Sequence, residues 1–272
     1  MSSFQRVWAD GDPTEVPVRS AATLMVVADR PELEVLLVQR TPRMAFGAGA
    51  WVFPGGRVDE TDKEFGSVVD GLTDEQASTM LDLSEGGLAW WLAAVRETAE
   101  EAGLVLACAS CTAEQLSVVR TAAARDDEEF FDALSAHQLR LDLSAVHEVA
   151  RFVTPVGPPR RFDTRFFVAE APPGQEVRHD PKELDDAKWF RPADAMDLWR
   201  SGELEMMSVT YRMLACLGRY PSVSSLMETA AGRPDPKRVR VNDPAGAYEV
   251  LLPGEPGYEQ AELEVEHGWV RI

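Results

Sequence analysis

The chain has 272 residues, of which 45% are hydrophobic and 27% charged, and its net charge at pH 7 is −19. This apolar fraction supplies a substantial core and excludes a disordered chain. The acidic balance argues against nucleic acid as a main partner, because phosphate backbones are bound by basic surfaces. It is compatible with a site for divalent cations, although a solvated acidic surface is the default explanation.

The N-terminal residues MSSFQRVWADGD lack the basic and apolar regions of a signal peptide, and no apolar run reaches membrane-spanning length. Three cysteines, an odd number, argue against a disulfide framework and for a reducing compartment. We interpret the C-x-x-C of Cys108 and Cys111 as structural thiols, because a zinc site usually needs a second such pair or nearby His. We therefore expect a cytoplasmic protein with no membrane partner.

In chain order, residues 19–28 and 33–40 indicate two strands of a hairpin with the turn DRPE. Residues 40–56 form a Gly-rich loop that leads into a short strand. Thr73 and Gln76 have the spacing of a capping box, which predicts the start of a helix.

Residues 87–103 are the clearest helix, since they are rich in Ala, Leu and Glu, contain no Pro and end at Gly103. Apolar residues recur there at steps of three and four: Leu88, Trp91, Leu92, Val95 and Ala99. They predict one buried stripe along the helix.

The later elements alternate between helices and strands. We predict one or two helices in 114–138, strands in 149–157 and 164–172, a strand entering a helix in 187–203, and a helix in 206–220. From about Pro221, Pro and Gly turns alternate with short strands, which we interpret as a C-terminal β extension. The mixture indicates an α/β or α+β sandwich.

Glu97, Glu100 and Glu101 stand at positions i, i+3 and i+4 of the predicted helix, so their carboxylates lie on one side of it. Like charges at this spacing repel. One explanation is a solvated acidic face, and the other is a site for a hard cation such as Mg²⁺ or Mn²⁺, which prefers oxygen ligands. The residues alone leave both open.

The segment RETAEEAGL, Arg96 to Leu104, resembles the second half of the Nudix box, G-x5-E-x7-R-E-U-x-E-E-x-G-U with U apolar. The segment GGRVDETD, with Gly56 as the box glycine, resembles the first half. Asp62 then stands where the family has Glu, and 33 residues separate it from Arg96 where the pattern has seven. A loop insertion of this kind costs little closure entropy, so we expect the two halves to meet in space.

A box split by an insertion is similar to that of the Nudix branch of peroxisomal coenzyme A diphosphatases. The segments RSAATL, RTPRMAFGAGAWVFPGGRVD, TPVGPPRRFDTRFFVA and LLPGEPGY also resemble this branch and occur in the same order. The resemblance implies an α/β/α sandwich with a mixed central sheet, an inserted helical segment within the box and a β-rich C-terminal extension. We assign 1–15 to an N-terminal arm, 16–220 to the Nudix hydrolase domain and 221–272 to the extension, with box halves 55–62 and 96–104 and an insertion of about 63–88.

By this resemblance, Glu97, Glu100 and Glu101 hold Mg²⁺ or Mn²⁺, and either Glu97 or Glu101 orients or deprotonates the attacking water. Arg96 is expected to pair with a box carboxylate and fix its rotamer. Gly55 and Gly56 would let the loop fold back against the helix and approach the substrate. The roles of Asp59 and Asp62 stay open, because Asp is shorter than the family's Glu.

Several residues are candidates for contacts with a nucleotide. Phosphate contacts are assigned to Arg40, Arg161 and Arg165, with Arg43 and Arg160 as further candidates, since a guanidinium suits phosphate. For each arginine singly, the alternative of a surface residue on a loop stays open. Phe162 and Trp189 could stack on adenine, although core packing is the favoured interpretation. Glu183 is a candidate for a further carboxylate near the metals.

The resemblance implies hydrolysis of a nucleoside diphosphate linked to another group, with coenzyme A or acyl-CoA as the preferred substrate and 3′,5′-ADP and (acyl-)phosphopantetheine as products. One alternative is a pyrophosphatase for ADP-ribose or NADH, and another is a non-catalytic Nudix-fold binding or regulatory module. By analogy with dimeric family members, a homodimer is a further expectation. We also hypothesise that the inserted helix lies over the site.

Overall fold

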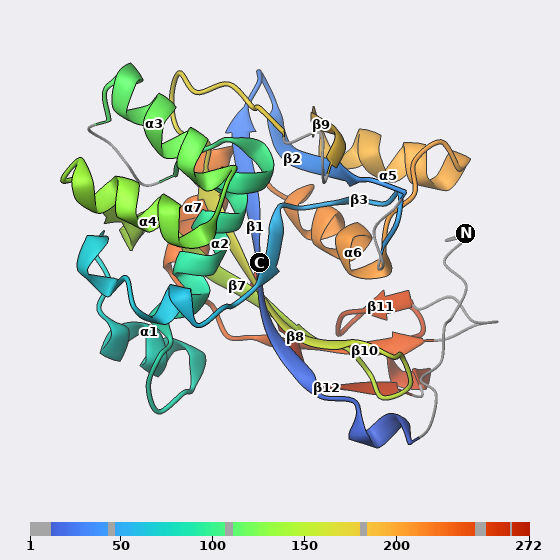
Figure 1. Ribbon diagram of the computed structural model, residues 1–272. Coiled ribbons are helices and arrows are strands. Elements are labelled where there is room, and N and C mark those ends of the chain that lie inside the picture. The colour runs from blue at the N-terminus through green and yellow to red at the C-terminus, as the bar shows by residue number, and fades with distance from the viewer. Residues whose placement is uncertain (1–11, 43–46, 107–110, 180–183, 243–248, 262) are drawn as a thin grey trace.

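A mixed sheet of ten strands forms the centre of the part of the chain that the computed structural model describes (Figure 1). The structure describes residues 12–42, 47–106, 111–179, 184–242, 249–261 and 263–272. The strands of this sheet are β1 (Val18–Asp29), β2 (Leu33–Arg40), β3 (Trp51–Val52), β4 (Gly55–Arg57), β7 (His147–Val153), β8 (Arg161–Glu170), β9 (Leu184–Phe190), β10 (Lys237–Asn242), β11 (Glu249–Leu251) and β12 (Leu263–Val270).

The strand order is β11-β10-β12-β7-β8-β1-β2-β3, with β4 paired to β1 and β9 paired to β2. Strands β1 and β8 run parallel along the pairs from Val18↔Arg161 to Val27↔Glu170, and the other pairs are antiparallel. The prediction of a mixed central sheet is therefore confirmed. A separate pair, β5 (Val69–Asp70) and β6 (Leu141–Asp142), is parallel.

Helices cover both faces of the sheet. They are α1 (Asp74–Leu81), α2 (Leu88–Ala102), α3 (Ala113–Ala123), α4 (Asp127–Ala136), α5 (Pro192–Ser201), α6 (Ser208–Leu217) and α7 (Val223–Ala231). Short 3₁₀ turns occupy Pro13–Glu15, Thr61–Lys63, Gly66–Val68, Leu143–Ala145 and Tyr258–Gln260. One core lies between α1–α4 and the sheet, and a second lies between α5–α7 and the opposite face. This arrangement is the expected α/β/α sandwich.

The two strongest helix predictions are confirmed. Thr73 and Gln76 form both hydrogen bonds of a capping box at the start of α1. Helix α2 buries the whole predicted apolar stripe against the first core, and it ends at Gly103, whose φ of +64° is a left-handed conformation that favours glycine.

The inserted segment is fixed to the N-terminal end of α2. Gly87 occupies the N-cap position of this helix and has no side chain that could cap it. The carboxylate of Asp74 in α1 instead accepts hydrogen bonds from the backbone N–H groups of Gly86 (2.9 Å) and Leu88 (3.0 Å). Glu97 lies roughly 13 Å further along the helix. Helix α1 therefore does not lie over the carboxylates, contrary to our hypothesis.

Residues 221–272 differ from the expected β extension in two ways. They begin with the helix α7, which the sequence did not predict. Their strands also continue the main sheet, because Val270 of β12 pairs with Ala150 of β7. The last residue, Ile272, is 3% exposed within the second core, so this segment is an integral part of the sandwich.

Two further expectations can be compared with the described residues. None of their helices has the length and apolar character needed to span a membrane. Cys111 is disulfide-bonded, so its interpretation as a structural thiol is wrong, while Cys108 lies outside the described residues. Cys216 is a free thiol buried in the second core.

Candidate active site

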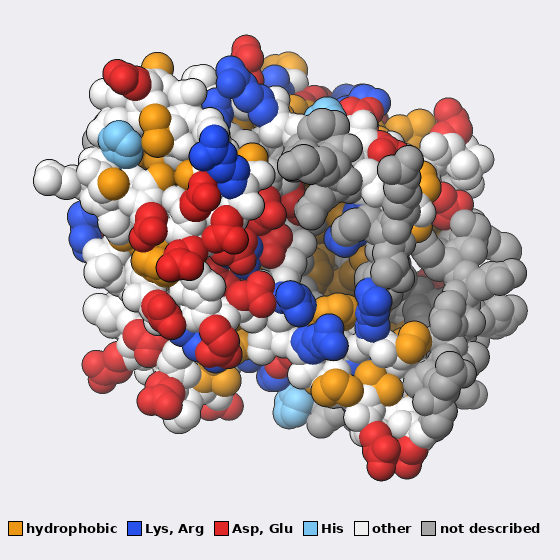
Figure 2. Space-filling model, in the orientation of Figure 1, with side chains coloured by type: hydrophobic (Ala, Val, Ile, Leu, Met, Phe, Trp, Pro, Cys, Tyr) orange, Lys and Arg blue, Asp and Glu red, His pale blue; other side chains and the backbone are white. Residues whose placement is uncertain are grey.

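Three carboxylates lie on one side of the C-terminal half of α2. The apolar stripe of this helix is buried against the sheet, so Glu97, Glu100 and Glu101 are directed elsewhere. The Glu97 side chain is 14% exposed and Glu101 is 4% exposed. Figure 2 shows Asp and Glu side chains gathered over α2 and α4, and beside them Lys and Arg side chains that border a hollow.

The glycine loop meets this helix, as we expected for the two halves of the box. The backbone N–H of Gly55 donates a hydrogen bond of 2.9 Å to Oε2 of Glu101. A Cβ on Gly56 would overlap the carboxylate of Glu97, so only glycine allows this close approach. Gly55 has φ +154°, and a side chain there would collide with the backbone of Ala22 and Thr23.

Arg96 holds the box loop from inside. It is 1% exposed, and it forms two hydrogen bonds to Asp62, Nε to Oδ1 at 2.9 Å and Nη2 to Oδ2 at 3.2 Å. Its Nη2 also donates to the carbonyl of Arg57 at 3.1 Å. Asp62, whose role the sequence left open, is thus the buried partner of Arg96, and Asp59 lies at 3.8 Å from Nη2.

The other terminal nitrogen of Arg96, Nη1, faces three carboxylates. Glu97 and Asp127 each lie at 3.1 Å and Glu100 lies at 3.5 Å. The pairing of Arg96 with box carboxylates was expected. The contact with Asp127 was not expected, because this residue belongs to α4 and to no motif. In the sequence it is marked only as part of the acidic run DDEE.

The carboxylates perturb one another. Burial raises the pKa of Glu97 to about 7 although Arg96 opposes the shift, and the charges of Asp127 and Asp62 raise it further. Burial also raises the pKa of Asp62 in spite of its hydrogen bonds with Arg96. The pKa of Arg96 is raised, because its carboxylate partners outweigh the lowering effect of burial. Surplus negative charge of this kind favours a bound cation.

The donors at this site fit a hard divalent cation. Glu97, Glu100 and Glu101 offer only oxygen, and Mg²⁺ usually takes one or two protein carboxylates and completes its shell with water and substrate phosphates. Within the described part of the chain, no three His, Cys, Asp or Glu side chains already form a metal-binding group. The arrangement therefore suits a cation shared with a phosphate ligand better than a closed all-protein cage.

The structure does not bring Arg161 and Arg165 to these carboxylates. Arg165 is 3% exposed and pairs with the buried Glu148 at 2.7 Å, while its Nη2 donates to the carbonyl of Leu81 at 3.0 Å. Arg161 is buried and its Nε donates to the carbonyl of Thr154 at 3.0 Å. Arg165 is thus paired within the fold and not with the carboxylates of α2, and its contact with phosphate stays a prediction.

The remaining candidates are distributed over the structure. Arg40 is half-buried at the end of β2, and its Nε has no hydrogen-bond partner in the described structure. Arg160 is exposed, and Trp189 packs against the first core, as favoured above. Phe162 is half-buried. Arg43 and Glu183 lie outside the described residues.

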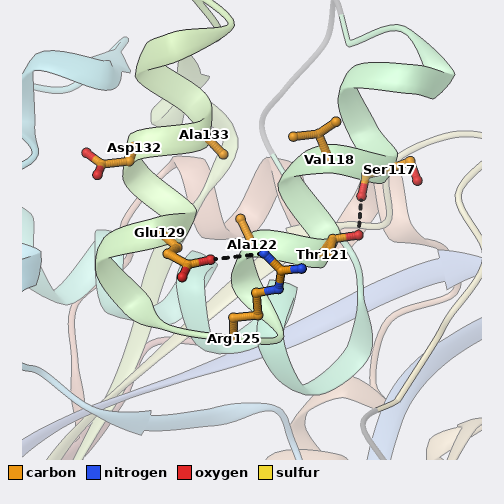
Figure 3. Close-up of a pocket in the computed structure, with 8 residues that line it drawn as sticks. All are labelled: Ser117, Val118, Thr121, Ala122, Arg125, Glu129, Asp132 and Ala133. Carbon is orange, nitrogen blue, oxygen red and sulfur yellow. Dashed lines mark hydrogen bonds and ion pairs between the residues drawn. The ribbon is translucent and has the colours of Figure 1, made fainter.

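A separate pocket of about 380 Å³ lies between α3 and α4 (Figure 3). Its lining comprises Ser117, Val118, Thr121, Ala122, Arg125, Glu129, Asp132 and Ala133. It contains none of the predicted site residues, and we assign it no function.

Comparison with known proteins places these features in a family. Residues 72–213 match the family model described as the NUDT19 Nudix domain. The chain is 25% identical over 243 residues to the acyl-coenzyme A diphosphatase NUDT19 of Xenopus laevis, a match that covers 74% of this chain and 64% of that protein. It is 26% identical over 276 residues to the human acyl-coenzyme A diphosphatase NUDT19, covering 79% of this chain and 72% of the relative.

A solved structure agrees with the fold. The crystal structure of a Nudix hydrolase from Alicyclobacillus acidocaldarius is 31% identical, with a TM-score of 0.67. The match covers 79% of this chain and 97% of that structure. The similarity thus extends through most of the chain, well beyond the box residues.

Proposed function

Because the chain belongs to the Nudix hydrolase family, in the group of the NUDT19 Nudix domain, we propose that it cleaves the diphosphate bond of coenzyme A or an acyl-CoA with the help of Mg²⁺ or Mn²⁺. Family membership favours a hydrolase over the non-catalytic module. The relatives named as acyl-coenzyme A diphosphatases support the substrate class. Cytoplasmic location and a homodimer stay predictions.

One observation carries the proposal: the split box reassembles in space. Gly55 donates to Glu101, and the missing side chain of Gly56 makes room for the carboxylate of Glu97. Residues from both sides of the insertion therefore lie together. Phosphoryl transfer is catalysed mainly by positioning and by charge neutralisation, and both need such a joint arrangement.

Hydrolysis adds water across one P–O–P linkage. The water oxygen bonds to one phosphorus, the bridging oxygen leaves with the other phosphate, and the protons pass to products and solvent. When bound, the divalent cation supplies charge neutralisation and activates water. Glu97, Glu100 and Glu101 would hold it, and Glu97 or Glu101 would orient or deprotonate the water.

Other residues of the site hold the box loop and the carboxylates of α2 in place. Arg96 and Asp62 fix the end of the box loop through their buried ion pair. The Gly55–Glu101 hydrogen bond sets the distance between loop and helix. Gly55, Gly56 and Arg40 are the residues that we assign to substrate contact.

The test is incubation of the purified protein with Mg²⁺ or Mn²⁺ and coenzyme A, followed by chromatography of the products. We expect 3′,5′-ADP and phosphopantetheine, and their loss in a Glu97→Gln variant. Absence of 3′,5′-ADP above the level of that variant would reject the coenzyme A proposal. ADP-ribose and NADH belong in the same panel, and preferential turnover of either would assign the alternative.

A further inference from the structure

We propose that Asp127 is a positioning residue for the cation site, which it serves by holding Nη1 of Arg96 from outside the Nudix box. The inference rests on the proposed function, because it concerns the same carboxylates. It adds a residue from helix α4 that no box pattern contains.

The contacts of Arg96 divide into two groups. Nε and Nη2 hold Asp62 and the carbonyl of Arg57, so they serve the loop. Nη1 is left to Glu97, Glu100 and Asp127. Of these three carboxylates, two are the proposed cation ligands, and Asp127 is the only one that lies away from α2.

The position of Asp127 is specific within its acidic run. Asp126 caps α4 by accepting from the backbone N–H of Glu128 at 2.9 Å, and Glu129 lies 3.7 Å from Arg125. Glu128 is exposed. Asp127 alone among these four carboxylates reaches Arg96, and its side chain is 30% exposed.

An aromatic contact fixes α4 in this place. Phe131 is fully buried and stacks on Phe65, with ring centroids 4.6 Å apart and planes inclined by 11°. Phe65 follows Asp62 by three residues. The segment that supplies Asp62 and the helix that supplies Asp127 are thus packed together, and they place a carboxylate on each end of the Arg96 guanidinium.

This arrangement has an electrostatic consequence. Without Asp127, Nη1 of the buried Arg96 would have, among the described residues, only Glu97 and Glu100 as partners, and it would hold them more tightly. A carboxylate engaged by Arg96 is a weaker ligand, because part of its charge is already neutralised. By sharing Nη1, Asp127 leaves more of the charge of Glu97 and Glu100 for the cation.

The experiment measures Mn²⁺ binding to the full chain directly, by the loss of the electron paramagnetic resonance signal of free Mn²⁺, so it does not depend on turnover. Asp127→Asn keeps the shape and removes the charge. Glu128→Gln removes the same charge from the next residue without touching Arg96. Asp127→Glu restores a carboxylate on the same helix, and Asp127→Ala serves as a second variant if the Asn protein does not fold.

We expect Asp127→Asn to weaken Mn²⁺ binding by about tenfold, the lower end of the effects known for partners of metal ligands. Glu128→Gln should stay within about twofold of the parent, since an exposed charge acts only through the screened field. Asp127→Glu should recover part of the loss.

Equal Mn²⁺ affinity in the parent and in Asp127→Asn would overturn the inference, and so would equal losses in Asp127→Asn and Glu128→Gln. Parent protein that binds no Mn²⁺ would reject both this inference and the metal-dependent function. Parent protein that binds Mn²⁺ in the expected order of variants, but cleaves no coenzyme A, would reject only the substrate proposal.

Discussion

Two buried arginines, Arg96 on α2 and Arg165 on β8, have similar burial but opposite charge surroundings. They are 1% and 3% exposed. Five carboxylates lie within 4 Å of Arg96: Asp59, Asp62, Glu97, Glu100 and Asp127. Arg165 has one close carboxylate, Glu148, and a second, Asp163, at 3.9 Å.

Around Arg165 the cations are in excess. Glu148 is shared with Arg233 at 3.3 Å, and Asp163 pairs with Arg151 at 2.6 Å. Arg165 and Arg233 also donate hydrogen bonds to the last carbonyls of α1. The dipole of a helix favours cations at its C-terminal end. We call the carboxylates around Arg96 the first centre, and Arg165, Glu148 and Arg233 the second centre. The second centre joins the insertion to β7 and β8.

The comparison separates function from structure by charge balance. Where buried carboxylates are outnumbered by arginines, as around Arg165, no negative charge is left over for a cation, so the loss of a carboxylate there should mainly affect stability. A buried arginine among surplus carboxylates leaves negative charge that the fold does not neutralise, and such charge is suited to a cation. Burial alone does not distinguish the two sites.

The largest effect on stability is expected from Glu148→Ala. It leaves Arg165 buried without its close partner, which costs about 3–5 kcal/mol in the free energy of unfolding. Urea unfolding measures the loss. The exposed pair Arg191–Asp194 provides a control, because Asp194→Ala should leave the unfolding midpoint nearly unchanged.

A double variant sharpens this test. Glu148→Leu combined with Arg165→Met removes both charges, and most of the lost stability should return because no unpaired charge stays buried. If the double variant were no more stable than Glu148→Ala, the unpaired charge would not be the cause of the loss.

At the first centre, Glu97→Gln should have the opposite profile. Glu97 is a proposed cation ligand, so removal of its charge should reduce kcat/KM by about a hundredfold or more, since metal ions provide several kcal/mol of transition-state stabilisation. The free energy of unfolding should not fall, because the variant removes one of several mutually repelling carboxylates. A stability loss as large as that of Glu148→Ala would show that the first centre is also structural.

Gly56→Ala tests the approach of the loop to Glu97. The new Cβ would overlap the end of a flexible side chain, so Glu97 can move aside at a small cost in stability but then leaves its place. We expect an activity loss of about tenfold, since small misplacements of reacting groups are costly. Gly66→Ala is the control, because its Cβ would meet Leu88 at an ordinary 3.5 Å.

Local patterns explain which features the sequence revealed. The capping box of Thr73 and Gln76 and the stop at Gly103 depend on residues a few positions apart, so they could be predicted before the structure. Helix α7 also has such signals, an N-cap at Ser222 and buried Val223 and Leu226. The Pro and Gly residues around this helix favour turns and short strands, and so indicate a β segment instead.

Long-range contacts could not be predicted in this way. Asp127 reaches Arg96 from another helix, next to the packed pair Phe65 and Phe131, and nothing in the acidic run distinguishes it from Glu128. Arg165 was a candidate for phosphate because of its residue type alone, and its burial against Glu148 depends on the pairing of β7 with β8. Sequence spacing identified the carboxylates of one helix, whereas the partners that balance them come from other elements.

The smallest expected effect concerns pH and lies at the edge of the second centre. Burial lowers the pKa of His147 from its usual 6.5, and the charge of Arg233 lowers it further. In the window below pH 6.5, the unfolded chain therefore binds a proton that the folded chain does not. The contribution of His147 to stability is present above that pH and is lost as the pH falls through the window.

His147→Gln removes this dependence. Between about pH 7.5 and about pH 5.5, which brackets the usual pKa of histidine, the melting temperature of the parent should fall more than that of the variant. His137→Gln serves as the control, because this exposed residue follows α4. If the melting temperature fell equally with pH in the parent and in His147→Gln, the positive charge around Glu148 would not affect His147, and His147 would not belong to the second centre.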